Sequence, residues 1–183
     1  MLKVRGRAPS CSRALEGTGF VIAPERVMTN AHVVAGTTDV TVEVGVGEFD
    51  ATVVHYDAQT DIAILAVPDL EATPLEFRTD EIAAGEDGIV LGYPLDGPYT
   101  ASEARVRERI RMLRGPDIYD AQTVTRDVYT VRAKVRSGNS GGPAVDSAGR
   151  VQTTIFASRV GSDSSGYGVP TSLVREELAG AGS

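Results

Sequence analysis

Cysteine and histidine are scarce in this sequence. Cys11 is the only cysteine among 183 residues, which excludes a disulfide within the chain and a metal site built from several thiolates. Cys11 is then either a lone thiol or the partner of a cysteine outside this sequence. His32 and His55 are the only histidines, and two dispersed histidines do not make a usual zinc site. The sequence predicts neither a metal nor another cofactor.

Long apolar runs are also lacking. No segment approaches the roughly 20 apolar residues that a membrane span needs. Met1 leads straight into a basic, alternating segment instead of a signal peptide, so we expect a mature soluble domain or one cut from a longer protein. The 18 basic and 25 acidic residues give a net charge of −7, which disfavours nucleic acid as a partner.

Helical patterns are nearly absent, whereas glycine and proline recur at short intervals. Between them lie short apolar or alternating segments typical of β-strands, such as Asp-Val-Thr-Val-Glu-Val at residues 39–44. Many short strands with frequent turns predict an all-β sandwich or barrel. The least regular stretch, residues 67–86, is a candidate junction between two halves. Only the C-terminus is typical of a helix, with cap residues at 170–172 and a stop at Gly180.

Arginine occupies every second position from residue 105 to residue 111. Good helix formers fill this segment, but the alternation favours a strand with the four arginines on one face and Val106, Ile110 and Met112 on the other. The arginine face is either an ordinary solvated surface or a docking patch for an anionic substrate or partner.

The hexapeptide Gly-Asn-Ser-Gly-Gly-Pro at residues 138–143 carries the strongest chemical signal. A serine hydroxyl is a weak nucleophile unless a neighbouring base takes its proton and N–H groups stabilise the developing oxyanion. Glycine at position 138 lets the chain point the N–H groups of Gly138 and Ser140 at one spot. The pattern therefore identifies Ser140 as the candidate nucleophile. A glycine-rich turn with an incidental serine is the alternative.

His32 and Asp61 are the candidate partners of Ser140. His32 directly follows an apolar strand, and Asp61 begins the apolar run that continues to residue 67. A carboxylate there needs a partner, such as a histidine N–H, because an unpaired buried charge is costly. Asp57 is the competing carboxylate and ranks lower because its surroundings are turn-like. His55 ends a strand and leads into a polar stretch, so we interpret it as structural.

Four motifs, in this order, resemble those of the trypsin/chymotrypsin-like serine proteases. They are Gly-Thr-Gly-Phe-Val-Ile at 17–22, Thr-Asn-Ala-His-Val-Val at 29–34, Asp-Ile-Ala-Ile-Leu at 61–65 and Gly-Asn-Ser-Gly-Gly-Pro at 138–143. The asparagine before Ser140 and the spacings between the motifs are similar to the HtrA group. Segments at 26–36, 115–119 and 124–130 are closer still to a membrane-anchored periplasmic acid-resistance protease of that group.

The resemblance implies a chymotrypsin-like fold of two six-stranded antiparallel β-barrels with a short C-terminal helix. A single protease domain would span residues 1–183, with the barrels at about 1–75 and 86–170 and the helix at about 171–179. The active site would lie in the cleft between the barrels.

The resemblance also implies what each residue does. His32 would act as general base and then general acid, Asp61 would orient it, and Ser140 would form the acyl-enzyme. The backbone N–H groups of Gly138 and Ser140 would bind the oxyanion. The extended polypeptide substrate would pair with a segment of three residues, Phe156, Ala157 and Ser158.

The implied location is the periplasm, with a tether to the membrane through segments outside this chain. An oxidising compartment would also suit a disulfide between Cys11 and a cysteine outside this chain. The stress or acid-resistance role follows from the same resemblance.

The chain departs from the family at two points. Asn139 stands where zymogen-type digestive proteases carry the aspartate that binds a newly cut N-terminus, so activation by that ion pair is not expected. The family often sets specificity near the position of Lys134. No acidic residue stands there, which disfavours cleavage after arginine or lysine.

Two other functions compete with the serine endopeptidase. Residues 138–142 also fit the Gly-x-Ser-x-Gly elbow of α/β-hydrolases, but both histidines precede Ser140 and a proline follows where a helix should begin, so we reject that class. The second is a catalytically inactive protease fold that only binds peptides. The presence of His32, Asp61 and Ser140 together argues against it.

Overall fold

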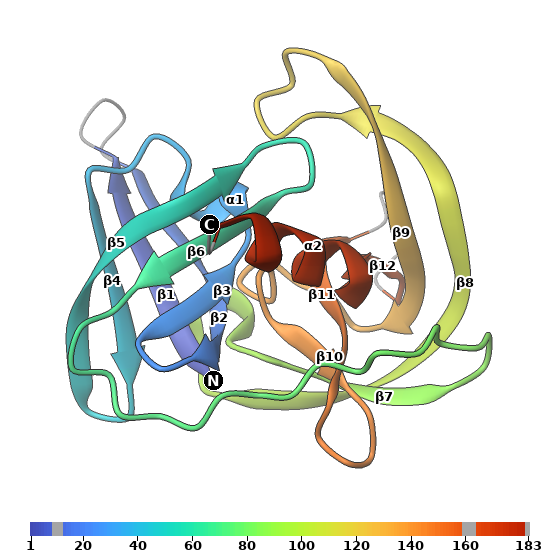
Figure 1. Cartoon of the computed structure of the whole chain (residues 1–183), viewed down its shortest axis with the longest axis horizontal. Helices are drawn as coiled ribbons and strands as arrows, with labels where there is room; N and C mark the ends of the chain where they lie inside the picture. The colour runs from blue at the N-terminus through green and yellow to red at the C-terminus, as the bar shows by residue number, and fades with distance from the viewer. Residues whose placement is uncertain (9–12, 159–163, 182–183) are drawn as a thin grey trace.

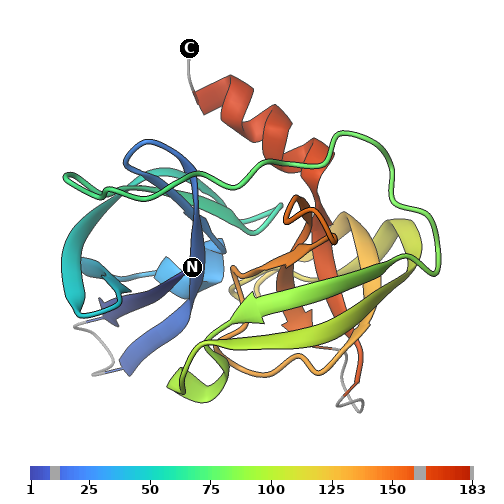
Figure 2. The ribbon, with the colours of Figure 1, turned by 90° about the horizontal axis from the view of Figure 1, so that it is seen from below.

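The computed structural model describes residues 1–8, 13–158 and 164–181, so Cys11 lies outside the described residues. The described strands form two closed antiparallel barrels of six strands each, followed by a C-terminal helix. This arrangement confirms the predicted fold class. Figures 1 and 2 show the barrels side by side.

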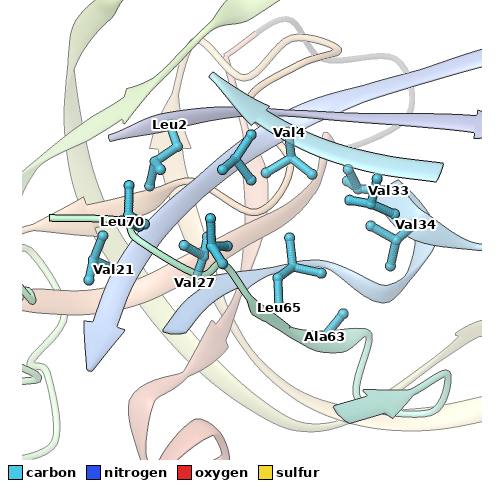
Figure 3. Close-up of a cluster of buried hydrophobic side chains, with 12 residues drawn as sticks. Leu2, Val4, Val21, Val27, Val33, Val34, Ala63, Leu65 and Leu70 are labelled. Atoms are coloured by element: carbon cyan, nitrogen blue, oxygen red, sulfur yellow. The ribbon is translucent and has the colours of Figure 1, made fainter. Parts of the chain in front are cut away.

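The first barrel has the strand order β1-β2-β3-β6-β5-β4 and closes where β4 pairs with β1. Alternation sets its inner face, because Val40 and Val42 of β4 are buried while Asp39 is exposed. Valine and leucine dominate the core (Figure 3). The strands are Leu2–Ala8 (β1), Arg13–Ala23 (β2), Arg26–Thr29 (β3), Asp39–Val44 (β4), Gly47–Asp57 (β5) and Ile62–Ala66 (β6).

The second barrel has the order β10-β11-β12-β9-β8-β7 and closes where β7 pairs with β10. Its longest strands, Thr100–Pro116 (β8) and Thr123–Ala133 (β9), form a curved hairpin that extends well beyond the other strands (Figure 1). The remaining strands are Asp87–Gly92 (β7), Pro143–Val145 (β10), Val151–Ser158 (β11) and Gly166–Pro170 (β12).

A shared apolar cluster joins the two barrels. Its buried members include Phe20, Met28 and Ile62 from the first barrel, Val145, Val151 and Val169 from the second, and Val174 from the C-terminal helix. Truncating a fully buried aromatic side chain such as Phe20 typically costs about 3–5 kcal/mol. The cluster therefore holds the two barrels in a fixed relation. Residues 67–86 lie between β6 and β7 and contain no regular strand.

The helices are short. One turn, Ala31–Val34 (α1), follows β3, and a 3₁₀ turn, Pro94–Asp96 (η1), links β7 to β8. The sequence did not predict either, because a single turn is too short to show a period. The C-terminal helix Thr171–Ala181 (α2) was predicted, but it continues past the expected stop at Gly180. No helix in residues 1–8, 13–158 and 164–181 has the length and apolar character to cross a membrane.

The arginine-rich segment lies in β8, as predicted, but its two faces are not as regular as expected. Register shifts after Val106 and Ile110 interrupt the alternation. As a result Met112, predicted opposite the arginines, is 77% exposed. The Arg109 side chain is only 17% exposed and pairs with Asp127 at 2.5 Å. The arginine face is largely neutralised by such pairs, which also join Arg105 to Asp87 and Arg111 to Glu81.

Candidate active site

A histidine and an aspartate of the first barrel form a hydrogen-bonded pair. His32 lies in α1 directly after β3, and Asp61 directly precedes β6, the strand paired with β3. His32 Nδ1 lies 2.7 Å from Asp61 Oδ2, and the His32 backbone N–H donates to Asp61 Oδ1 at 2.9 Å. The Asp61 side chain is only 3% exposed. Its carboxylate thus fixes the ring orientation and leaves His32 Nε2 without a partner among the described residues.

The backbone at Asp61 adopts a strained conformation. Its φ of 60° lies in the left-handed region, which few residues other than glycine adopt. Such strain costs about 1–3 kcal/mol and persists where the surroundings enforce it, often at functional sites. Here the fully buried Asn30 donates through Nδ2 to the Asp61 carbonyl at 2.8 Å. Asn30 directly precedes α1 and makes no side-chain cap hydrogen bond to it, so its side chain joins the segment before His32 to the backbone of Asp61.

The loop that carries Ser140 packs directly against the first barrel. The Thr18 N–H donates to the Ser140 carbonyl at 2.8 Å, and the Thr18 hydroxyl donates to the Gly138 carbonyl at 2.6 Å. Gly141 has a φ of +83°, and a Cβ there would lie 2.4 Å from Thr29 Oγ1. Only glycine allows so close an approach. The loop is thereby held against the segment that leads into His32.

Two N–H groups of this loop are available to bind an anion. Gly138 has a φ of +92°, and a Cβ there would lie 2.3 Å from the Tyr93 carbonyl. Within the part of the chain that the structure describes, the N–H groups of Gly138 and Ser140 have no acceptor. The N–H of the intervening Asn139 is bonded to the Arg136 carbonyl. Two unpaired N–H groups around a serine match what oxyanion stabilisation needs.

The Ser140 hydroxyl faces a backbone carbonyl rather than the histidine. Its Oγ lies 3.5 Å from the Phe156 carbonyl oxygen, and no hydrogen bond joins it to His32 among the described residues. The structure thus pairs His32 with Asp61 and places Ser140 beside Phe156. Catalytic hydrogen bonds are often long or poorly aligned without substrate and tighten in the complex.

His32 and Asp61 open onto a cleft of about 660 Å³. The end of β11 lines the cleft with all three residues predicted to contact substrate, Phe156, Ala157 and Ser158. Residues 113–118 of the β8–β9 hairpin form another part of its lining. The cleft is therefore bounded by both barrels.

The backbone of residues 156–158 has an open side. β10 pairs with β11 only as far as Thr154. At the next residue, the Gly141 N–H donates to the Ile155 carbonyl and the Ile155 N–H donates to the Gly142 carbonyl. Beyond Ile155, no described strand pairs with β11 on that side. An open strand edge beside a cleft is a site where an extended peptide can add as a further strand.

The other candidates from the sequence lie apart from this pair. Asp57 accepts hydrogen bonds from the N–H groups of Gln59 and Thr60, as a turn aspartate does. His55 Nε2 lies 3.0 Å from Glu177 of α2. The structure thus pairs Asp61, rather than Asp57, with His32.

Sequence reasoning missed three residues that build the site. Thr18 and Asn30 lie inside motifs that carried the resemblance, but nothing in those motifs assigned them a role. Arg126 lies in the segment 124–130, but nothing there assigned it a role, because Arg126 bonds to the backbone of Gln59, far away in the chain. Its Nε donates to the Gln59 carbonyl at 2.7 Å, two residues before Asp61.

Comparison with known proteins agrees with this geometry. Residues 17–152 match the family model of the trypsin-like peptidase domain. The whole chain is 51% identical to serine protease Rv3671c of Mycobacterium tuberculosis, the protease MarP, and spans 46% of that protein's length.

Two further comparisons also match the chain to serine proteases. A Brucella suis protein named as a probable periplasmic DegP-like serine endoprotease is 32% identical over 169 residues, which are 88% of this chain and 32% of that protein. A crystal structure of the active form of the Rv3671c protease superposes with a TM-score of 0.93 at 51% identity, covering 97% of this chain and 78% of that one. The chain belongs to the trypsin-like peptidase family of serine proteases and resembles its HtrA group.

Proposed function

We propose that the chain is a single protease domain that hydrolyses peptide bonds as a serine endopeptidase. The observation that carries the proposal is the His32–Asp61 hydrogen bond at a cleft whose lining includes Phe156, the residue whose carbonyl oxygen lies 3.5 Å from Ser140 Oγ. A hydroxyl, an imidazole and a carboxylate with these neighbours suit acyl transfer.

In the proposed reaction, His32 Nε2 takes the proton of the Ser140 hydroxyl as Oγ attacks the scissile carbonyl. For this step the hydroxyl turns from the Phe156 carbonyl toward His32. The N–H groups of Gly138 and Ser140 stabilise the negative oxygen, and Asp61 stabilises the imidazolium. His32 then gives its proton to the leaving amine. Water, activated by the same imidazole, releases the acyl group from Ser140.

The proposed substrate is an extended polypeptide bound as an added strand along residues 156–158. The open side of β11 at Phe156, Ala157 and Ser158 supports this proposal, because backbone hydrogen bonds there would align the scissile bond with Ser140. Lys134, near the position that sets specificity in the family, supplies no negative charge for a basic side chain. We therefore expect little cleavage after arginine or lysine.

We infer that the full-length protein is an extracytoplasmic, membrane-tethered protease of stress or acid resistance. Two points support this inference: the motif resemblance to a periplasmic protease of that kind, and the naming of the Brucella relative as a probable periplasmic endoprotease. The chain spans about half the length of the relative Rv3671c. Any tether, and any disulfide partner of Cys11, would belong to segments beyond this chain.

A fluorophosphonate probe tests the proposed activity, because it reacts with an activated serine. We expect stoichiometric labelling of the chain at Ser140, hydrolysis of a peptide library, and loss of both in Ser140→Ala with an unchanged circular dichroism spectrum. The alternative is a protease fold that only binds peptides. Peptide binding without labelling at any pH would establish that alternative and reject the endopeptidase.

A further inference from the structure

The 3₁₀ turn η1 lies against the loop that bears the two free N–H groups. The Leu95 N–H donates to the Ser137 carbonyl at 2.7 Å, directly before Gly138. The Tyr93 carbonyl fills the space where a side chain at Gly138 would lie, and the Tyr93 N–H donates to the Thr18 hydroxyl at 3.1 Å. The position of η1 thus limits where the Gly138 peptide can lie.

The backbone of η1 is itself strained. Leu95 and Asp96 have φ values of 57° and 54°, two consecutive non-glycine residues in the left-handed region. Such residues keep this conformation only where their surroundings hold it. Leu95 is 64% exposed, so packing of its side chain does not supply that support. Something else must hold the turn.

Two cations of the first barrel hold it. From β1, Arg5 donates through one Nη to both carboxylate oxygens of Asp96, at 3.0 and 3.1 Å. Lys3 Nζ donates to the Asp96 carbonyl at 2.8 Å and to its carboxylate at 3.0 Å. Charged hydrogen bonds of this kind are the stronger ones in proteins. In Figure 2, η1 is the yellow-green turn at the bottom, at the end of β7.

The aromatic ring of Tyr93 strengthens the same connection. Lys3 Nζ lies 5.4 Å from the centre of this ring, within the range of a cation–π interaction. The Tyr93 hydroxyl donates to the Met1 carbonyl at 3.3 Å. Residues at both ends of η1 are therefore bound to β1 and the residue before it, while the middle of the turn contacts the serine loop.

We propose that Asp96 is a positioning residue for the oxyanion site, held by Lys3 and Arg5. The ion cluster fixes η1, and η1 fixes the Ser137–Gly138 peptide so that the Gly138 N–H stays directed at the oxyanion. The inference rests on the proposed function, since it assigns a purpose to the geometry around Ser140. If so, residues of β1 in the first barrel help to stabilise the transition state at Ser140 in the second barrel.

The substitution Asp96→Asn tests this role, because it keeps the side-chain size and removes the negative charge. Loss of a whole oxyanion donor typically lowers kcat about 10²–10³-fold, so partial displacement of Gly138 should lower it by about 10-fold or more. KM for a peptide substrate should stay within about twofold of the parent value, since residues 156–158 are untouched. The rate of fluorophosphonate labelling should fall with kcat.

A matched control separates positioning from general stability. Asp146→Asn also removes a carboxylate that fixes a turn and pairs with an arginine, here Arg150 at 2.8 Å. We expect it to lower the unfolding midpoint without a selective loss of kcat. If Asp96→Asn does not fold, Lys3→Met weakens the same cluster and keeps the Arg5 pair.

Three results have distinct meanings. A kcat within twofold of the parent in folded Asp96→Asn, or in folded Lys3→Met where Asp96→Asn does not fold, would overturn the proposal. Parallel changes in kcat and KM that match those of Asp146→Asn would do so too. Failure of the parent protein to react with the probe would instead reject the proposed protease activity.

Discussion

Arg126 of the second barrel donates from Nε to the backbone carbonyl of Gln59 in the first barrel at 2.7 Å. The same guanidinium donates to the Pro116 carbonyl at 2.8 Å and lies 5.8 Å from the centre of the Phe156 ring. One side chain therefore connects the loop that ends in Asp61, the β8–β9 hairpin and the wall of the cleft.

A second contact supports the same connection. The hydroxyl groups of Tyr56, in β5, and Tyr119, at the hairpin tip, lie 2.5 Å apart. Burial, and then the hydrogen bond with Tyr119, raises the pKa of Tyr56 above its usual value, and the nearby charge of Asp61 adds to the shift. Tyr56 therefore stays protonated at neutral pH, and its hydroxyl can donate the hydrogen bond of this bridge.

Arg126→Met should lower kcat/KM about 10-fold. The substitution keeps the apolar stem and removes the hydrogen bonds to Gln59 and Pro116, so the loop before Asp61 loses its support. A 10-fold loss corresponds to about 1.4 kcal/mol, close to the lower end of the about 1.5–3 kcal/mol that a hydrogen bond to a charged group contributes. Steady-state hydrolysis of a peptide ester measures kcat/KM of the variant and of the parent.

Arg114→Met is the control for charge alone. Arg114 lines the same cleft and is exposed, and its side chain makes no hydrogen bond or ion pair among the described residues. We expect it to retain nearly full activity. Equal losses in the two variants would show that the cleft needs positive charge rather than the hairpin contact.

Thr18→Val should destabilise the protein and slow labelling of Ser140. The buried Thr18 hydroxyl donates to Gly138 and accepts from Tyr93, so valine leaves a carbonyl and an N–H without a partner. Each such buried group costs about 1–3 kcal/mol, which gives a total of about 2–6 kcal/mol in urea unfolding.

Thr18→Ser keeps both hydrogen bonds and loses one methyl group, worth about 1 kcal/mol when buried. Its labelling rate should remain close to that of the parent. A Thr18→Ser protein as slow as Thr18→Val would mean that packing of the methyl group, not the hydroxyl, holds the serine loop.

The fold was predictable because its signals are local. Alternation in β4 and the glycines and prolines between segments depend on neighbouring residues, and a closed barrel is the usual way to bury one face of many short strands. The break in alternation along β8 was not predictable, because its register shifts arise from pairing with β9 and leave no mark on the composition.

The site divides in the same way. His32, Asp61 and Ser140 could be singled out as candidates because each sits in a motif with a chemical reason for its residue type. Arg126 and Asp96 could not, because their partners Gln59 and Arg5 lie more than 60 positions away in the chain. The orientation of the Ser140 hydroxyl depends on a side-chain rotation, which a sequence pattern cannot specify.

Asp61→Asn should lower turnover by about 10⁴-fold, the loss typical when the orienting carboxylate of a serine protease becomes an amide. Asp61 accepts hydrogen bonds from the His32 ring and the His32 backbone N–H through its two charged oxygens. Asparagine has one neutral acceptor oxygen in their place. Asp57→Asn serves as the matched variant, since Asp57 holds only the local turn at Gln59 and Thr60. A larger loss in Asp57→Asn than in Asp61→Asn would contradict the assignment of the carboxylate.

The Arg78 ion cluster should make stability fall in acid. Arg78 lies in the segment between the barrels and pairs with Asp80 at 2.7 Å and with Glu86. The hydrogen bond from Arg78 lowers the pKa of Asp80 to about 2, and a hydrogen bond from Arg78 also lowers the pKa of Glu86. A lowered carboxyl pKa stabilises the folded state above the unfolded pKa, which is about 3.9 for aspartate, and this contribution is lost as pH falls toward 2.

Asp80→Asn should therefore reduce the urea midpoint at pH 6, and the difference from the parent should shrink as pH falls from about 4 to about 2. The effect is small because Asp80 is exposed and solvent screens its charge. Urea titrations of both proteins at several pH values measure it. A difference that stays constant from pH 6 to pH 2 would mean that Asp80 acts through its size or its turn geometry, because a contribution from charge must disappear once the carboxylate is protonated.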